Sequence, residues 1–184
     1  VDYEDKVEDG YEFDRVETVP MELLGEGQVV KVYYKKRSDL SYTVNYLEQG
    51  TEKQISESKV VEGQTYQDEV TETAIDVPGY NKVDPTEATI TIDIDSNEIN
   101  FYYTKRTDLE YTVNYLEQGT ENKLAESKTI TNQTYEDVVT ENAVDVEGYN
   151  KVDPATQSIK IDVSNNIINF YYTKRTDISY TVNY

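Results

Sequence analysis

Two sets of residues in this chain carry side chains that could react or bind a metal ion. The first is a lysine, glutamate and asparagine trio that recurs 69 residues later: Lys59, Glu72, Asn100, Lys128, Glu141 and Asn169. A lysine amine can join an asparagine carboxamide in an isopeptide bond with loss of ammonia, while a nearby carboxylate moves the protons. That reaction needs a buried site, yet the alternation of its strand places Asn100 on the outward face. An isopeptide staple and a set of ordinary surface polar residues therefore stand as alternative hypotheses.

The second set is a series of oxygen-bearing side chains at Asp93, Asp95 and Asn97. Alternating acids of this kind begin calcium-binding loops, which need several hard oxygen ligands. The copy 69 residues later has Ser164 in place of Asp95, and neither copy has a glutamate at loop spacing. The pattern favours an ordinary acidic turn, so we predict no metal site, no cofactor and no catalytic residue.

Composition excludes several other classes of function. The 184 residues contain no Cys and no His, which removes disulfides, thiolate metal sites and the commonest general base. A formal net charge of −20 opposes binding to nucleic acid or to an anionic membrane, because both partners need a basic surface. No apolar run reaches membrane-spanning length. We therefore expect a non-enzymatic protein with no nucleic acid partner and no membrane insertion.

An internal repeat organises the chain. The segment NFYYTKRTD at 100–108 returns at 169–177, and a blurred copy, KVYYKKRSD, stands at 31–39. A fixed period of this kind is the signature of a tandem array. Aligned without gaps, the two complete copies agree at 45 of 69 positions. We predict a partial repeat at 1–39, full repeats at 42–110 and 111–179, and the first strand of a further repeat at 180–184.

Each full repeat is predicted to be mostly β with one short helix. Alternating apolar and polar residues indicate strands at 42–46, 55–61, 80 onward, 89–95 and 99–105. The turn-forming sequence DSNE at 95–98 predicts a hairpin between the last two strands. The acidic start of DEVTETA at 68–74 suits two turns of helix. We therefore predict an α+β fold of small tandem β-grasp-like (ubiquitin-like) domains, arranged as an elongated rod.

Paired tyrosines on the closing strand of each repeat should face in opposite directions. The inward set is Tyr34, Tyr103 and Tyr172. The outward set is Tyr33, Tyr102 and Tyr171. Inward tyrosines should lie in the core with their hydroxyls near a polar partner. Outward tyrosines are candidates for stacking on sugars or on a partner protein, and cross-strand packing on a half-exposed sheet is the alternative.

Each junction between repeats carries an arginine two residues before an aspartate: Arg37 with Asp39, Arg106 with Asp108, and Arg175 with Asp177. The junction sequence KRTDLEY at 105–111 has neither Gly nor Pro, so consecutive repeats should hold a preferred angle. In a chain this acidic, a planar guanidinium can bridge carboxylates from both neighbouring repeats. The alternative is a solvated charge without a mechanical role.

Four motifs together resemble the mucin-binding-protein (MucBP) repeat of Gram-positive bacterial surface adhesins: YTVNYLEQGTE, GQTY, DVPGYNKV and INFYYTKR. The positions that match the family pattern are Thr43–Tyr46, Gly63–Tyr66, Pro78–Tyr80 and Ile99–Tyr103. The second full repeat departs from that pattern in two places, where Asn132 replaces Gly63 and Glu147 replaces Pro78.

The resemblance implies a secreted, cell-wall-attached protein built from several β-grasp-like repeats. Its implied partners are host mucin or neutral glycans, together with neighbouring repeats of the same chain. A surface at −20 would repel sialylated or sulfated glycans, and this repulsion fades beyond about 8 Å at physiological salt. The family includes adhesive repeats and repeats that only extend a stalk carrying a distal adhesive domain, so both functions remain open.

Overall fold

The computed structural model describes residues 8–17, 31–177 and 179–183. The chain divides into two compact units. Unit 1 comprises Val1–Asp76 and Lys82–Tyr103, and unit 2 comprises Val77–Asn81 and Thr104–Tyr184. The short Val77–Asn81 segment thus groups with residues that follow it in the next sequence repeat.

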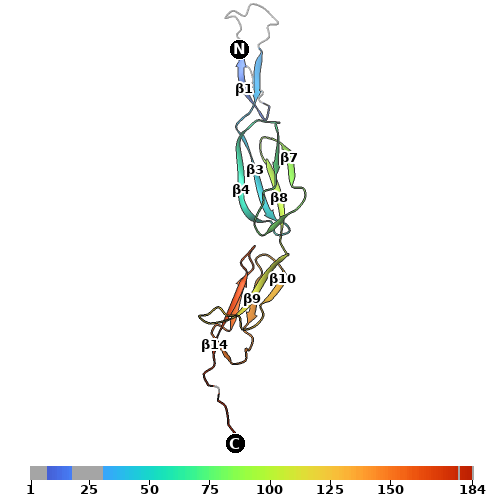
Figure 1. Cartoon of the computed structure of the whole chain (residues 1–184). Coiled ribbons are helices and arrows are strands. Elements are labelled where there is room, and N and C mark those ends of the chain that lie inside the picture. The colour runs from blue at the N-terminus through green and yellow to red at the C-terminus, as the bar shows by residue number, and fades with distance from the viewer. Residues whose placement is uncertain (1–7, 18–30, 178, 184) are drawn as a thin grey trace, which may run out of the picture. The chain divides into compact units, whose positions relative to one another are not determined.

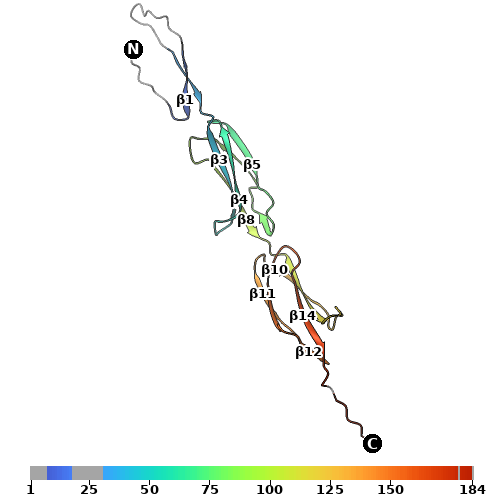
Figure 2. The same cartoon turned by 90° about the vertical axis from the view of Figure 1, so that its left-hand side faces the viewer.

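Unit 1 is built around a four-stranded sheet. Its strands are β1 (Tyr11–Val16), β2 (Val32–Lys36), β3 (Leu40–Glu48), β4 (Lys53–Gln64), β5 (Glu69–Thr73), β6 (Tyr80–Lys82), β7 (Glu87–Thr91) and β8 (Glu98–Lys105). The start of β6 and the end of β8 are assigned to unit 2. The large sheet has the order β4-β3-β8-β6, while β5 pairs with β7 and β1 with β2 (Figures 1 and 2). Strand β3 is antiparallel to β4 and parallel to β8. The first and last strands of the repeat therefore lie side by side at the centre.

Unit 2 has the same plan one period later. Its strands are β9 (Leu109–Glu117), β10 (Lys128–Gln133), β11 (Val138–Asn142), β12 (Tyr149–Lys151), β13 (Thr156–Lys160) and β14 (Ile167–Lys174). The sheet order is β10-β9-β14-β12, with β11 paired to β13. Strand β10 is shorter than its counterpart β4, because the residues equivalent to the first half of β4 form no strand in unit 2. A single β-bridge between Leu116 and Lys123 lies there instead.

The core of each repeat lies on the inward faces of the two central strands, because alternate residues of a strand point to the same side. In unit 1 the buried hydrophobic residues are Leu40, Tyr42, Val44, Tyr46, Ala74, Ile92, Ile99, Phe101 and Tyr103. The Tyr103 hydroxyl donates to the Ile75 carbonyl at 2.9 Å. Burial raises the pKa of Tyr103 to about 12. The predicted inward position of Tyr103 and of Tyr172 is confirmed.

The helix predicted at 68–74 is wrong. Glu69–Thr73 forms strand β5, which pairs antiparallel with β7. Residues Val70, Thr71 and Thr73 are β-branched and favour a strand, and the Thr71 and Thr89 hydroxyls lie 2.7 Å apart across the pair. The described residues contain no helix, so the fold there is all-β and not α+β. None of them could therefore cross a membrane as a helix.

The hairpin predicted around 95–98 is also wrong. Strand β7 pairs with β5, whereas β8 pairs with β3 and β6, so the turn connects two different sheets. Asn97 braces this turn: its side-chain carbonyl accepts from the Asp93 backbone N–H at 2.8 Å, and its amide donates to the Ser41 carbonyl at 3.1 Å. The alternating acids thus surround a braced turn, and the described residues hold no acidic cluster suited to a metal ion.

The outer parts of the chain are described only in part. Of the partial repeat at 1–39, the β1–β2 hairpin is described, while residues 1–7 and 18–30 lie outside the described residues. Of the strand predicted at 180–184, residues 180–183 form no strand, Tyr180 is 90% exposed, and residue 184 lies outside the described part. The assignment of 180–184 to a further repeat stays a prediction.

Candidate functional site

A tyrosine, a lysine and a glutamate from three strands meet at the edge of each core. In unit 1, Tyr42 lies on β3, Lys59 on β4 and Glu72 on β5. The Tyr42 hydroxyl donates to Glu72 Oε1 at 2.6 Å, and Lys59 Nζ donates to the same oxygen at 2.6 Å. Unit 2 repeats the arrangement with Glu141 accepting from Tyr111 and Lys128, both at 2.7 Å. The cluster joins the four-stranded sheet to the two-stranded sheet.

In unit 1 the hydrogen bonds of this cluster favour a charged Glu72 and Lys59 beside a neutral Tyr42. The hydrogen bonds from Lys59 and then from Tyr42 lower the pKa of Glu72, whose side chain is only 14% exposed. The hydrogen bond to Glu72 raises the pKa of Lys59, which favours the protonated amine. Burial, followed by the hydrogen bond to Glu141, raises the pKa of Tyr111 to about 12. The arrangement links the four-stranded sheet to the two-stranded sheet through charged hydrogen bonds.

The structure brings together two members of the predicted isopeptide trio. Lys59 pairs with Val44, whose side chain is buried, so Lys59 lies on the inward side of the sheet. Asn100 lies on the other side, where its amide oxygen accepts from the Asn45 amide at 2.9 Å. Asn169 is likewise bonded to Asn114 in unit 2. The isopeptide bond stays a prediction that intact mass decides, since each bond expels one ammonia.

The outward tyrosines occupy matching positions on β2, β8 and β14. Tyr33 is exposed, and the Arg15 guanidinium lies 4.4 Å from the centre of its ring. Tyr102 is half-buried and its hydroxyl donates to Glu52 at 3.3 Å, while the Glu52 charge raises the pKa of Tyr102. Tyr171 is half-buried. The three tyrosines therefore lie on three different strands, β2, β8 and β14. Their role as ligand contacts stays a prediction.

Each junction arginine forms a bidentate ion pair with the aspartate two residues further on. Arg106 donates through Nε and Nη2 to the two carboxylate oxygens of Asp108, both at 2.9 Å. This two-bond geometry lowers the pKa of Asp108. The same bidentate pairs join Arg37 to Asp39 and Arg175 to Asp177. Each of these pairs joins residues only two positions apart, and the predicted bridging of carboxylates from two repeats stays a prediction.

A glycine packed beneath a tyrosine ring is the feature that sequence reasoning missed. Within unit 2, the Arg106 N–H donates to the Gly79 carbonyl at 2.9 Å, and the Tyr135 N–H donates to the Arg106 carbonyl at 2.9 Å. The Tyr135 ring lies against Gly79, where any Cβ would overlap it. Gly79 has φ 83°, which also favours glycine. We call Gly79, Tyr80 and the Arg106 carbonyl a glycine socket.

The socket recurs in unit 1 with the same bonds. Tyr66 covers Gly10, and the Tyr66 N–H donates to the Arg37 carbonyl at 2.9 Å. An edge-to-face ring pair accompanies each socket, Tyr11 with Tyr66 at 5.7 Å and Tyr80 with Tyr135 at 5.5 Å. The Gly-Tyr and Gln-Thr-Tyr motifs both recur at 69 residues, which was the available signal. Their contact could not be inferred, because nothing in the spacing says which motifs meet.

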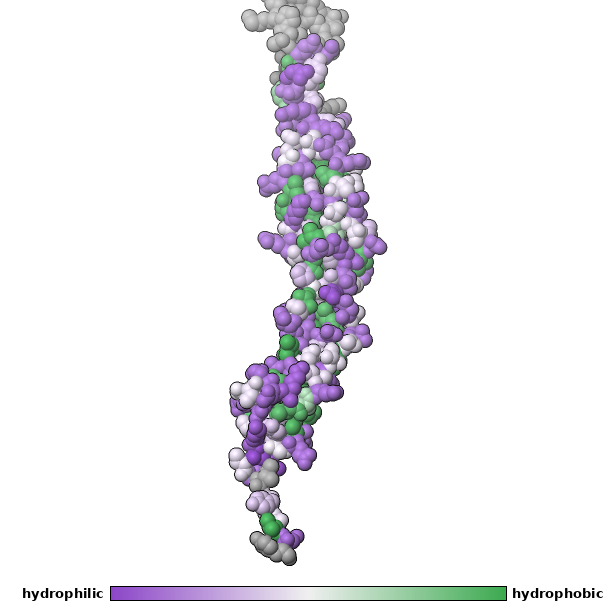
Figure 3. Space-filling view, viewed as in Figure 1, coloured by the Kyte–Doolittle hydropathy of each residue, from purple (hydrophilic) through white to green (hydrophobic). Residues whose placement is uncertain are grey.

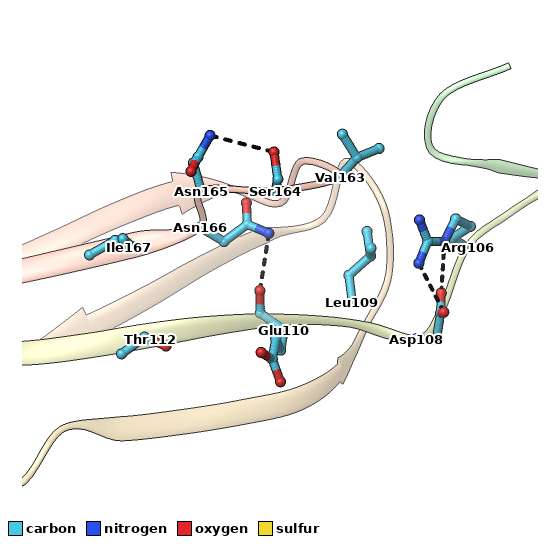
Figure 4. Close-up of a pocket in the computed structure, with 10 residues that line it drawn as sticks. All are labelled: Arg106, Asp108, Leu109, Glu110, Thr112, Val163, Ser164, Asn165, Asn166 and Ile167. Atoms are coloured by element: carbon cyan, nitrogen blue, oxygen red, sulfur yellow. Dashed lines mark hydrogen bonds and ion pairs between the residues drawn. The ribbon is translucent and has the colours of Figure 1, made fainter.

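An open polar pocket of about 450 Å³ lies beside the start of β9 (Figure 4). The Arg106–Asp108 pair borders it on one side and the 163–167 turn on the other. The Asn166 amide donates to the Glu110 carbonyl at 3.0 Å, and Ser164 lies beside Asn165 instead of beside a general base. Unit 1 has an equivalent pocket of about 350 Å³. Neither pocket contains a nucleophile paired with a base.

Comparisons with known proteins give structural matches and no sequence match. No protein-family model matches the chain, and no curated protein matches it. The type 2 repeat of the mucus binding protein MUB from Lactobacillus reuteri is 14% identical, with a TM-score of 0.27, and the match covers 73% of this chain and 99% of that one. The crystal structure of Mub-RV is 10% identical, with a TM-score of 0.27, and the match covers 73% and 98%.

Replacing the socket glycine should destabilise the fold more than replacing an uncovered glycine. Gly79→Ala combines a positive φ, worth about 1–2 kcal/mol, with displacement of the Tyr135 ring, worth about 1–3 kcal/mol. Gly148→Ala is the matched control, because Gly148 has φ 79° and nothing lies within 4 Å of its Cβ position. Urea unfolding measures both free energies. Equal losses would show that the ring does not press on Gly79.

Acid should weaken the fold through Glu72. Its pKa in the folded state lies below the ordinary value of 4.5, so the unfolded chain binds the proton more readily. The stability that Glu72 contributes is fully present above pH 4.5 and is lost as pH falls through the lowered folded pKa. Glu72→Gln should cost about 1–2 kcal/mol at neutral pH and reduce the loss of stability in acid.

The matched control is Glu69→Gln, which removes one negative charge from an exposed position on the same strand. Urea unfolding between about pH 2 and about pH 6 should show a shallower acid slope for Glu72→Gln only. The same slope for wild type and Glu72→Gln would contradict the assignment.

Proposed function

We propose that this chain is part of the stalk of an extracellular, cell-wall-attached surface protein of a Gram-positive bacterium. In this proposal the repeats at 42–110 and 111–179 are β-grasp-like domains that carry tension between the cell and a distal adhesive domain. They act mechanically and not as an enzyme. The extracellular location rests on the four motifs that resemble the MucBP repeat.

The parallel pairing of β3 with β8 is the observation that carries the proposal. The paired register runs from Thr43 with Glu98 to Glu48 with Tyr103. Tension along the chain enters each repeat before β3 and leaves after β8. Because the two strands are parallel, these points lie at opposite ends of the ladder. Since the hydrogen bonds run between strands, such tension shears all of them together instead of opening them one by one.

Unit 2 has the same geometry. Strand β9 pairs with β14 in parallel, from Thr112 with Ile167 to Glu117 with Tyr172. The connection from β8 to β9 is only Arg106–Asp108, and its backbone is tied to Gly79 within unit 2. A short, hydrogen-bonded connection passes tension from one ladder to the next with little slack.

The surface also suits a spacer. Hydrophilic residues cover most of the face seen in Figure 3, and the hydrophobic patches on it are small and separated. A net charge of −20 favours solubility and opposes the association of separate molecules. Both properties suit a stalk.

Pulling on opposite ends of the β3–β8 ladder should require several-fold more force than pulling on one end. The chain has no Cys, so introduced cysteines give unique handles. Ser38→Cys with Thr107→Cys loads the ladder in shear. Gln49→Cys with Thr107→Cys loads it from one end, because the Gln49 N–H bonds the Tyr103 carbonyl where β8 is about to leave the sheet. Single-molecule force spectroscopy measures both.

Terminal pulling on the whole chain gives a second check. Each repeat of 69 residues should unfold in one step that releases about 240 Å of extended chain, less its folded length. Equal rupture forces in the two cysteine geometries would contradict the mechanical proposal even if these steps are seen.

Adhesion is the second candidate, favoured by the matching outward tyrosines. An aromatic ring on an exposed strand can stack on a neutral sugar, and Tyr102 and Tyr171 hold the same place on β8 and β14. In this alternative each repeat is a MucBP-like contact for mucin or another glycan. The negative surface then restricts binding to neutral sugars.

Tyr102→Ala combined with Tyr171→Ala should weaken mucin retention about tenfold if the repeats adhere, which equals about 1.4 kcal/mol. The matched control replaces both residues with phenylalanine, which keeps the stacking surface. Retention of the chain on immobilised mucin is the measurement, with circular dichroism to show that both variants fold. Unchanged retention of the alanine variant would remove adhesion through these rings.

A further inference from the structure

The Gly-Tyr motif occurs three times, and one copy differs from the other two. Gly10 and Gly79 each lie beneath a tyrosine ring, and each is followed by a tyrosine that meets the same ring edge to face. Gly148 is followed by Tyr149, yet no atom of the described residues lies within 4 Å of its Cβ position. The third copy is therefore a socket without its ring.

The third socket is built in the same conformation as the filled ones. Gly148 has φ 79°, against 83° for Gly10 and Gly79. The Arg175 N–H donates to the Gly148 carbonyl at 2.9 Å, as Arg106 does to Gly79. An open pocket of about 720 Å³ lies here, bordered by the 145–151 segment and Arg175. The site is thus formed in advance of any occupant.

Three contacts of the filled sockets are missing from the third among the described residues. Among these residues no ring covers Gly148, no ring pairs with Tyr149, and no backbone N–H donates to the Arg175 carbonyl. In each filled socket one residue supplies all three, Tyr66 in unit 1 and Tyr135 in unit 2. The missing contacts therefore define a single type of residue in a single backbone position.

We propose that the Gly148 socket binds the Gln-Thr-Tyr turn of another repeat of this type. The tyrosine ring lies over Gly148 and meets Tyr149 edge to face, while the tyrosine N–H donates to the Arg175 carbonyl. The two filled sockets identify this occupant, because both hold a tyrosine from a Gln-Thr-Tyr turn. The inference concerns how repeats connect and holds for stalk and adhesive repeats alike.

A nearby lysine adds charge complementarity. In unit 2, Lys105 pairs at 3.2 Å with Glu136, the residue that follows Tyr135, whose ring fills the socket. Lys174 holds the position equivalent to Lys105 and lies 3.1 Å from Glu117. An incoming turn with an acid after its tyrosine would give Lys174 a second partner. A Gln-Thr-Tyr-Glu turn, as at 133–136, should therefore fit better than the Gln-Thr-Tyr-Gln turn at 64–67.

The test extends the chain by one repeat and observes Gly148 by NMR. The extended protein contains residues 1–179 followed by a second copy of 111–179, and the starting 184-residue chain is the reference. A ring over a glycine shifts its Hα resonances upfield. In the starting chain Gly79 should show this shift and Gly148 should not. In the extended protein Gly148 should shift to a similar degree.

Two matched variants of the added copy separate docking from mere linkage. Replacing its counterpart of Tyr135 with alanine should abolish the Gly148 shift, whereas phenylalanine should keep it. An unshifted Gly148 in the extended protein would overturn the proposal, and so would a shift that survives the alanine variant. The rupture-force comparison concerns the ladder inside one repeat, so it can fail or succeed independently.

A second readout uses stability and does not depend on ring shifts. In the 184-residue chain Gly148→Ala meets no neighbouring atom and carries only the backbone cost of its positive φ. In the extended protein the added methyl group would also displace the docked ring. The loss of stability caused by Gly148→Ala should therefore grow on extension to match that of Gly79→Ala. An unchanged loss would overturn the proposal.

Discussion

The parallel pairing of β3 with β8 is the interaction on which each repeat depends. These strands begin and end the repeat, and their inward residues, such as Val44 and Phe101, form the centre of the core. The hairpin partner β4 and the short strand β6 extend the sheet on either side. The second sheet is then held over the core by the Tyr42 and Lys59 bonds to Glu72. A repeat of 69 residues can bury only a small hydrophobic core, so the other strands depend on this central strand pair.

The strands could be predicted from alternation alone, because the period-2 pattern directly encodes which side faces the core. Tyr103 was placed inward for this reason, and it is fully buried. The helix predicted at 68–74 is wrong because the β-branched residues Val70, Thr71 and Thr73 favour a strand more strongly than the acidic start favours a helix. The predicted hairpin is wrong because β7 and β8, which follow one another in the sequence, belong to different sheets. Turn residues show where a strand stops and not which strand it joins.

The candidate site was predictable in residues but not in partners. The junction arginines and aspartates were recognised from spacing, and a two-residue separation is short enough for local pairing. The sequence also predicts a role for Lys59 and Glu72, yet their contact with Tyr42 depends on how the two sheets stack. Asn132 shows the value of local rules: it replaces Gly63 at φ 57°, and asparagine tolerates that conformation better than most residues. Contacts that depend on local backbone conformation can thus be predicted from the sequence, whereas contacts between the two sheets cannot.

The three-residue connection between β8 and β9 also governs how a chain of near-identical repeats avoids mispairing. Strands β3 and β9 share the sequence YTVNYLE, so β8 meets two chemically equivalent partners. A parallel pair needs a crossover of roughly a dozen residues or more, and Arg106–Asp108 is far too short for β8 to pair with β9 in that way. On the ribosome, β3 has already emerged when β8 appears, while β9 is excluded by its tether. The short connection therefore favours the pairing of β8 with β3 over β9 during synthesis, although β3 and β9 share the same sequence.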